Sequence, residues 1–137
     1  MITVLDKLFV LETNRTTYAF RVMPTGHLEH LYYGRKIRLD SDDGLKELSE
    51  FAPGNSSVYD AENNSFSFED VKLEISAPGK GDVREPSVEL INSDGSRTSD
   101  FVYTSHEISD GKAREEGIPG SYGEDAKVLK VLLKDKG

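Results

Sequence analysis

The chain has 137 residues, of which 36% are hydrophobic and 31% charged, the size and composition of one globular domain with a real core. It contains no cysteine, which excludes disulfides and thiol chemistry, and no apolar run approaches the roughly 20 residues of a membrane helix. The net charge of −8 repels polyanions and so excludes nucleic acid as a partner class, whereas a neutral sugar is not disfavoured.

The N-terminal residues 1–7 place no basic segment ahead of an apolar one, which argues against a secretory signal. The absence of cysteine is also compatible with a reducing compartment. We therefore expect a cytoplasmic protein that has no membrane partner.

The dominant hydrophobic periodicity of the chain is two residues, which predicts β-strands. In the first clear example, Tyr18, Phe20 and Val22 alternate with smaller or polar residues. The Pro-Thr-Gly sequence at residues 24–26 favours a turn, and the alternation resumes over residues 28–32. These two segments predict a β-hairpin.

Helix is scarce in the pattern. Leu45, Leu48 and Phe51 recur every three residues after a pair of aspartates, and this spacing predicts one or two helical turns. Residues 52–64 are rich in Gly, Asn and Ser and predict a loop, as does the Pro- and Gly-containing segment 77–81.

Period-two alternation returns in the second half of the chain and again predicts strands. Two Asp-Gly pairs favour tight reversals there, because glycine tolerates positive φ. The alternating segments are 66–68, 71–75, 88–90, 101–108 and 129–133, and the Asp-Gly pairs are Asp94-Gly95 and Asp110-Gly111. The whole pattern, without an internal repeat, predicts an all-β antiparallel β-sandwich with little helix, formed as a single domain by residues 1–137.

Paired carboxylates are the first chemistry to consider, because glycoside hydrolysis needs two acids flanking one bond. Among 25 acidic residues some pair will always lie at a workable separation. Asp82 and Glu85 have the most distinctive setting, since Arg84 lies between them and Pro86 stiffens the segment. That setting favours a structural or binding role, so no catalytic residue is assigned.

The sequence predicts neither a metal site nor a phosphate loop. His27 and His30 are three residues apart and would lie on opposite faces of a strand, and His106 is distant in sequence. Residues 79–82, Gly-Lys-Gly-Asp, lack the Gly-x-x-x-x-Gly-Lys-Ser/Thr spacing of a phosphate-binding loop. We expect no cofactor.

The Tyr32-Tyr33-Gly34-Arg35 sequence is the other candidate binding cluster. Aromatic rings beside an arginine stack on sugar faces and bond to their hydroxyl groups. In a strand, Tyr32 and Tyr33 point to opposite faces, so one ring is expected in the core and the other at the surface. The core interpretation of this cluster is favoured over sugar binding.

Several of these segments, taken in order, resemble the non-catalytic N-terminal region of family 36 glycoside hydrolases, the large microbial α-galactosidases. Residues 26–35 are similar to the family's Gly-x-Leu-x-x-Leu-Tyr-x-Gly-x stretch, and residues 81–86 to its Gly-Asp-Phe-Arg-x-Pro motif. The other similar positions are Thr17-Tyr18, Asp94-Gly95-Ser96, residues 99–103, Ser105-His106, Gly111-Lys112, residues 117–119 and Ser121-Tyr122. The ordered set is more specific than any single motif.

The resemblance implies a galactose-mutarotase-like β-supersandwich, of which this chain is the first portion, followed in the family by a (β/α)8 barrel. In the family that barrel supplies a nucleophilic aspartate and an acid/base aspartate for a retaining mechanism. No segment of this chain matches the barrel, so we expect the chain to be non-catalytic. The implied function is scaffolding and oligomerisation within an α-galactosidase, with a contribution to the rim of a neighbouring active site.

The resemblance also implies the partners: the rest of the parent chain, further copies of it in a homo-oligomer, and a galactoside ligand. The candidate rim or interface residues are Tyr33, Arg35, Asp82 and Arg84. Val83 departs from the family, which has an aromatic residue there, and this reduces any stacking surface in the loop.

Two other functions stay open. A free-standing carbohydrate-binding module needs an exposed aromatic platform, yet the chain has no tryptophan. A complete enzyme needs paired acids that converge in a deep pocket. If later strands of a larger sandwich are missing, exposed ladder edges predict self-association, strand swapping or an independently stable subset of strands.

Overall fold

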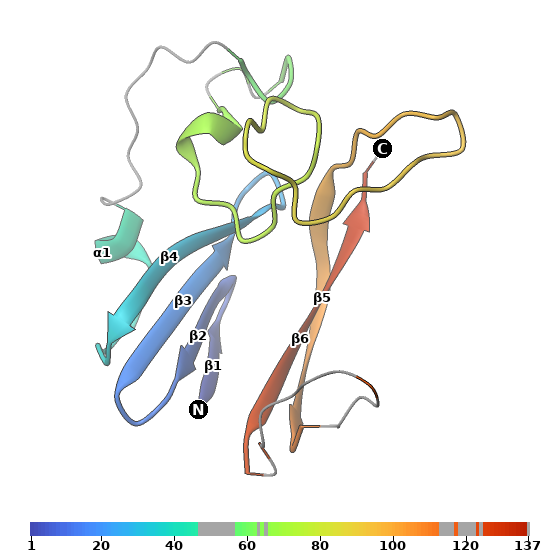
Figure 1. Cartoon of the computed structure of the whole chain (residues 1–137). Coiled ribbons are helices and arrows are strands. Elements are labelled where there is room, and N and C mark those ends of the chain that lie inside the picture. The colour runs from blue at the N-terminus through green and yellow to red at the C-terminus, as the bar shows by residue number, and fades with distance from the viewer. Residues whose placement is uncertain are drawn as a thin grey trace.

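The computed structural model describes residues 1–46, 57–62, 64, 66–112, 117, 123 and 125–136. Within them, antiparallel strands form two sheets that face each other, and a layer of loops lies across one end of both sheets (Figure 1). The predicted all-β antiparallel fold with little helix is therefore confirmed.

The first sheet is a four-stranded antiparallel meander in the order β1-β2-β3-β4. Its strands are β1 (Ile2–Leu5), β2 (Leu8–Glu12), β3 (Thr16–Val22) and β4 (Leu28–Arg35). Each pair is joined by a short connection, so neighbours in sequence are neighbours in the sheet.

The β1–β2 hairpin is an element that period-two alternation does not reveal. Residues 8–11 are a continuous apolar run, and Leu8, Phe9 and Val10 are all buried because both faces of β2 are covered. Asp6 reverses the chain with a left-handed φ of 55°, which aspartate tolerates better than most residues. A run without alternation therefore encodes a strand buried on both sides.

The predicted hairpin formed by β3 and β4 is confirmed. Its turn is closed by Gly26, whose φ is +92° and whose N–H donates to the Met23 carbonyl at 2.9 Å. A bulge between Ala19 and Phe20 shifts the register, because Ala19 pairs with Tyr32 whereas Phe20 pairs with His30. The predicted alternation over residues 28–32 is therefore broken at the extra residue between those partners.

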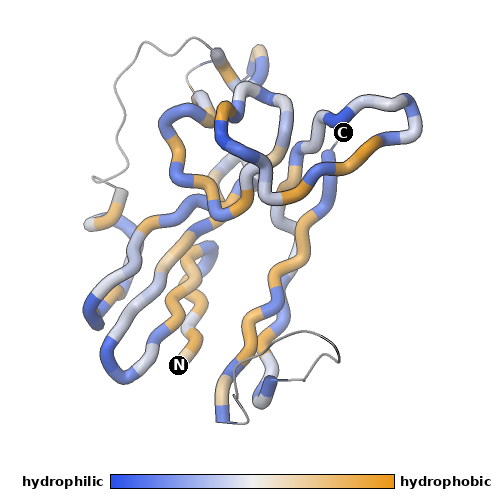
Figure 2. Tube along the Cα trace, in the orientation of Figure 1, coloured by the Kyte–Doolittle hydropathy of each residue, from blue (hydrophilic) through white to orange (hydrophobic). Residues whose placement is uncertain are grey.

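The second sheet consists of β5 (Phe101–Asp110) and β6 (Lys127–Asp135), both predicted from alternation. One face of this pair packs on the first sheet and builds the core between the sheets. That core contains Phe9, Phe20, Val22 and Leu28 from the first sheet, with Tyr103, Leu129, Val131 and Leu133 packed against them. Figure 2 shows the apolar residues running along the facing strands, as burial of one face requires.

The opposite face of the first sheet is covered by the segment after β4. Leu45 of the short helix α1 (Asp43–Lys46) packs with Leu8, Val10 and Leu31 in a second buried cluster. The predicted helix thus begins as expected, and its later positions Leu48 and Phe51 lie outside the described residues. No helix in the described part of the chain is long and apolar enough to cross a membrane.

The strands predicted over 66–68, 71–75 and 88–90 are wrong. Residues 66–75 instead contain the 3-10 helix η2 (Phe68–Asp70), begun by Ser67, whose hydroxyl accepts from the Glu69 N–H at 3.2 Å. They contact the first sheet through the isolated Glu29–Leu73 bridge. Residues 87–98 follow an irregular path, closed at Gly95 by a hydrogen bond to the Asn92 carbonyl. The predicted loops are confirmed at 77–81 and over the described part of 52–64.

Candidate functional site

The loop layer has a hydrophobic core of its own, which holds the segment 79–86 in place. Five buried residues from separate segments form it, with Leu73 packed against them: Met23, Tyr59, Phe66, Phe68 and Val71. Their rings meet edge-on or tilted, with Phe66 and Phe68 centroids 5.3 Å apart. Because Phe66 and Phe68 serve this core, they do not join a sheet.

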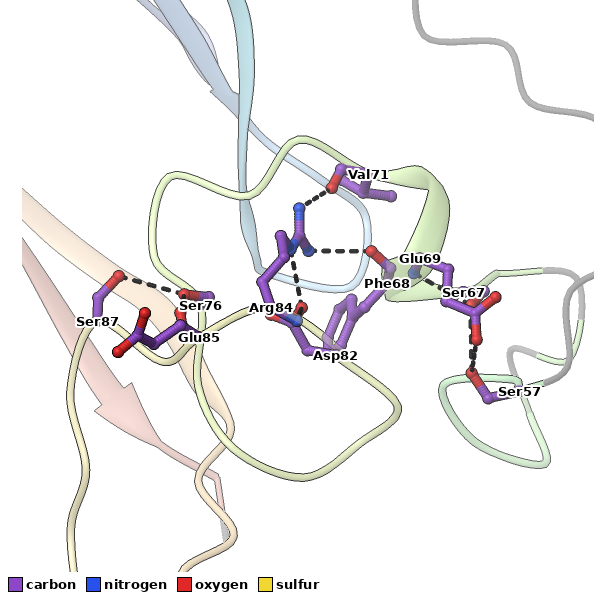
Figure 3. Close-up of polar contacts among 10 residues, drawn as sticks. All are labelled: Ser57, Ser67, Phe68, Glu69, Val71, Ser76, Asp82, Arg84, Glu85 and Ser87. Carbon is purple, nitrogen blue, oxygen red and sulfur yellow. Dashed lines mark hydrogen bonds and ion pairs between the residues drawn. The ribbon is translucent and has the colours of Figure 1, made fainter.

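Arg84 ties the predicted loop to that core (Figure 3). Its guanidinium donates from Nη2 to the Phe68 carbonyl at 2.9 Å and from Nη1 to the Val71 carbonyl. Its Nε donates to Oδ1 of Asp82 at 2.8 Å. One planar side chain thus satisfies two backbone carbonyls and one carboxylate, a geometry that lysine could not reproduce.

Asp82 is the most constrained of the predicted site residues. Its side chain is 1% exposed, and Oδ1 also accepts from the Arg84 backbone N–H at 3.2 Å. Its other oxygen, Oδ2, is buried without a hydrogen-bond partner among the described residues, as is the hydroxyl of Ser99. Buried polar atoms are nearly always bonded, so each such atom calls for a partner from outside the described residues.

The backbone of this loop is unusual, because Gly79, Lys80 and Gly81 all have left-handed φ, of +94°, 55° and +81°. The loop also packs closely on the segment that leads into β5. The Ser99 N–H donates to the Pro78 carbonyl at 3.0 Å, and a Cβ at Gly79 would lie 2.5 Å from Cγ2 of Thr98. The path of the loop is therefore fixed by backbone as well as by Arg84.

Replacing Gly79 with alanine is expected to destabilise the chain clearly more than the same change at Gly95. Both residues have left-handed φ, which costs a residue with a Cβ about 1–2 kcal/mol, yet only Gly79 also meets a side chain. Gly95 has nothing within 4 Å of a built Cβ, so its substitution measures the cost of the left-handed φ alone. Urea denaturation of both variants measures the difference, and Thr98→Ala should recover part of the loss at Gly79. Equal losses at the two glycines would contradict the close packing.

Val83, at the tip of the segment, is 77% exposed. Arg84 points back into the molecule, whereas Val83 faces out. Val83 therefore offers a small exposed aliphatic surface on this segment.

Tyr33 and Arg35 lie near the end of β4. The Tyr33 ring is 69% exposed and rests edge-on against Tyr18, with centroids 6.0 Å apart. Tyr32 is partly buried against the second cluster, and its hydroxyl donates to the Arg35 carbonyl at 2.8 Å. One tyrosine thus packs inward and one lies at the surface, as the strand pattern predicts.

The structure places the four predicted residues as two separate pairs. Arg84 bonds to the Phe68 and Val71 carbonyls, and the same segment reaches the start of β4 through the Glu29–Leu73 bridge, whereas Arg35 ends the strand (Figure 1). At about 3.3 Å per residue, the eight residues of β4 span about 25 Å, so the two pairs lie towards opposite ends of the strand.

A cluster that sequence reasoning missed lies on the face of the first sheet that also holds Tyr33. Glu74 accepts from the Tyr18 hydroxyl through Oε2, and its Oε1 lies 2.9 Å from Nδ1 of His30. Burial, and next the contact with Glu74, raises the pKa of Tyr18, so its phenol stays protonated. These groups come from positions 44 and 56 residues apart, so no local pattern indicates the contact.

The sequence matches the glycosyl hydrolase family 36 N-terminal domain over residues 26–137. The chain belongs to this family. The family 36 resemblance expected from the ordered motifs is therefore confirmed.

The relatives are α-galactosidases. The bifunctional α-galactosidase/sucrose kinase AgaSK of Mediterraneibacter gnavus is 32% identical over 132 residues, which are 95% of this chain and 14% of that protein. The α-galactosidase AgaA of Geobacillus stearothermophilus is 29% identical over 132 residues, or 94% of this chain and 18% of that protein. The solved galactosidase domain of AgaSK superposes with a TM-score of 0.86 at 28% identity, covering 99% of this chain and 19% of that one.

This family 36 chain thus corresponds to the N-terminal domain of α-galactosidases and spans less than a fifth of the length of these relatives. A solved variant of AgaA in complex with raffinose also superposes, with a TM-score of 0.78 at 29% identity over 94% of this chain and 18% of that one.

Proposed function

We propose that this chain is a non-catalytic part of an α-galactosidase that hydrolyses terminal α-galactosides. In this proposal it forms, as a single domain, the first portion of a β-supersandwich whose parent chain carries the catalytic barrel. It serves scaffolding and subunit contact in a homo-oligomer, and the 79–86 loop contributes to the rim of a neighbouring active site. A cytoplasmic location belongs to the same proposal and is tested by cell fractionation.

The main support for the rim role is the burial and hydrogen bonding of the Asp82 carboxylate. Its carboxylate is almost wholly buried, Arg84 fixes one oxygen, and the other oxygen has no partner among the described residues. An ionised carboxylate only accepts hydrogen bonds, so the unpartnered oxygen suits an O–H or N–H donor, which a ligand or a second subunit brings once the loop moves and uncovers this buried oxygen. Raffinose, which the AgaA complex holds, is rich in such donors.

Asp82→Asn in the intact parent enzyme is expected to lower kcat/KM for p-nitrophenyl α-galactoside by about 10- to 100-fold, because a hydrogen bond to a charged group contributes about 1.5–3 kcal/mol. Asp94→Asn, the same chemical change in the exposed turn at Asp94-Gly95, serves as the matched control. Light scattering on both variants separates loss of assembly from loss of substrate contact. Unchanged kcat/KM and unchanged assembly for Asp82→Asn would remove the rim role.

A second candidate function is a stand-alone carbohydrate-binding module, and the exposed Tyr33 ring braced on Tyr18 favours it. Calorimetric titration of the purified chain with galactose and raffinose discriminates the two. Saturable heat that disappears in Tyr33→Ala supports the module. Absence of heat, together with no turnover of p-nitrophenyl α-galactoside, supports the non-catalytic domain.

A further inference from the structure

A buried polar network lies where the loop layer meets both sheets. Asp100, just before β5, is bound through both oxygens: Oδ1 lies 2.7 Å from Nε2 of His27, and Oδ2 accepts from the Tyr59 hydroxyl at 2.7 Å. All three residues are buried. The backbone of Asp100 is bound as well, since its N–H donates to Oδ1 of Asp135 at 2.9 Å and its carbonyl accepts from the Lys136 N–H at 2.9 Å.

The hydrogen bonds determine which nitrogen of His27 carries the proton. An ionised Asp100 carboxylate can only accept, so Nε2 must be the donor. The other nitrogen, Nδ1, lies 2.9 Å from the Thr25 hydroxyl, which can donate to it. Both nitrogens are thereby satisfied by a neutral ring, and burial lowers the pKa of His27 against the opposing effect of Asp100.

The His27 ring also contacts the residues that anchor the Asp82–Arg84 loop. Its edge meets Phe68 with centroids 4.7 Å apart and Tyr59 with centroids 5.1 Å apart. Phe68 is the residue whose carbonyl accepts from Arg84. A continuous series of contacts therefore runs from Asp100 through His27 and Phe68 to Arg84, and Arg84 holds Asp82.

We propose that His27 is a positioning residue, which holds the 79–86 loop in the conformation that the structure shows. It does so by joining Asp100 to Phe68, whose carbonyl accepts from Arg84 of the loop. His27 touches neither Asp82 nor Arg84 and acts through Phe68. The folded site lowers the pKa of His27, so by linkage protonation of the ring disfavours the folded arrangement and is expected to loosen the loop. An effect of His27 on catalysis rests on the proposed rim role of the loop, whereas the positioning of the loop by His27 does not.

The charged groups near the network affect the protonation of His27 in opposite directions. Asp100 favours the imidazolium form, and Lys136 disfavours it. The Tyr59 phenol stays neutral, because burial, and next its bond to Asp100, raises the pKa of Tyr59. Among the described residues, the titratable groups that face His27 or its partners are Asp100, Tyr59, Lys136, Lys80, Asp60 and Asp135.

Nuclear magnetic resonance on the ¹⁵N-labelled chain tests the proposal without substrate, so its outcome is independent of the rim role. His27→Gln keeps an N–H donor toward Asp100 and loses the ring, whereas His27→Phe keeps a ring and loses the donor. Both variants are expected to speed amide exchange over residues 79–86, and of the Arg84 Nε–H, by at least about tenfold. His106→Gln is the control, because His106 bonds Tyr103 in β5, away from the loop.

Unchanged exchange in both folded His27 variants would overturn the proposal, as would equal acceleration in His106→Gln. A pH titration of the unmodified chain keeps the test decisive even if a variant does not fold. The His27 nitrogens should show the Nε2–H tautomer at pH 7.5 and a midpoint below the ordinary value near 6.5. Loop exchange should rise over the same pH interval. A midpoint at or above 6.5, or protonation without faster exchange, would count against it.

Discussion

Phe9→Ala is expected to destabilise the purified chain by about 3–5 kcal/mol, the usual range for removing a buried phenylalanine. Phe9 is 1% exposed and lies between the two sheets. It stacks on Phe20 with centroids 4.8 Å apart and meets His106 of β5 edge-on at 5.0 Å. Truncation therefore leaves a cavity at the interface between the sheets. In a domain of this size the loss corresponds to a fall in Tm of about 10–15 °C, measured by calorimetry.

Two substitutions provide the controls for this result. Phe9→Leu retains most of the volume and should lose less than half as much stability. Tyr33→Ala removes an aromatic ring that is largely exposed, so it should change stability by no more than about 0.5 kcal/mol. Similar losses for Phe9→Ala and Tyr33→Ala would mean that the two sheets do not share a packed core in solution.

Arg84→Ala is expected to produce the second large effect, a loss of about 2–3 kcal/mol with release of the 79–86 loop. The change removes donors to the Phe68 and Val71 carbonyls and leaves the buried Asp82 carboxylate without its cation. The figure is held below that of a fully buried pair because 37% of the Arg84 side chain is exposed. Urea denaturation gives the free energy, and amide exchange over residues 79–86 reports the loop.

A double-mutant cycle isolates the charge contribution. Adding Asp82→Asn to Arg84→Ala neutralises the abandoned carboxylate and should recover about 1–2 kcal/mol of the loss. Arg84→Lys keeps a positive charge but cannot bridge two carbonyls and a carboxylate, so it should recover only part of the stability. Additive effects in the cycle would show that Asp82 and Arg84 do not interact as the structure has them.

The sheets were largely predictable because their signals are local. The β3–β4 hairpin follows from alternation on both sides of a turn at Gly26, and β5 and β6 follow from alternation alone. The β1–β2 hairpin was missed because β2 is buried on both faces and shows no alternation. The segments 66–68 and 71–75 were wrongly predicted as strands for the opposite reason. Their apolar residues alternate, yet they fill the core of the loop layer and not a sheet face.

The contacts of the candidate residues were predictable only in part. The motif at residues 81–86 indicated Asp82 and Arg84, and their mutual contact spans only two residues. The carbonyls that anchor Arg84 lie 13 and 16 residues away, in segments predicted as strands. Tyr33 and Arg35 could not be placed relative to that loop, because their separation depends on where the loop crosses β4.

Residue patterns along the chain are enough to predict the class of fold, the strands with one solvent-exposed face, the turns that require glycine and the family. These features are written in the spacing of neighbouring residues, because side chains alternate along a strand and glycine alone adopts left-handed φ without strain. The buried hydrogen bond between His27 and Asp100, 73 residues apart, becomes apparent only in the folded chain, as does the Asp82 oxygen that has no partner among the described residues. Such contacts depend on how the loop layer packs across the ends of two sheets, and no local spacing encodes that packing.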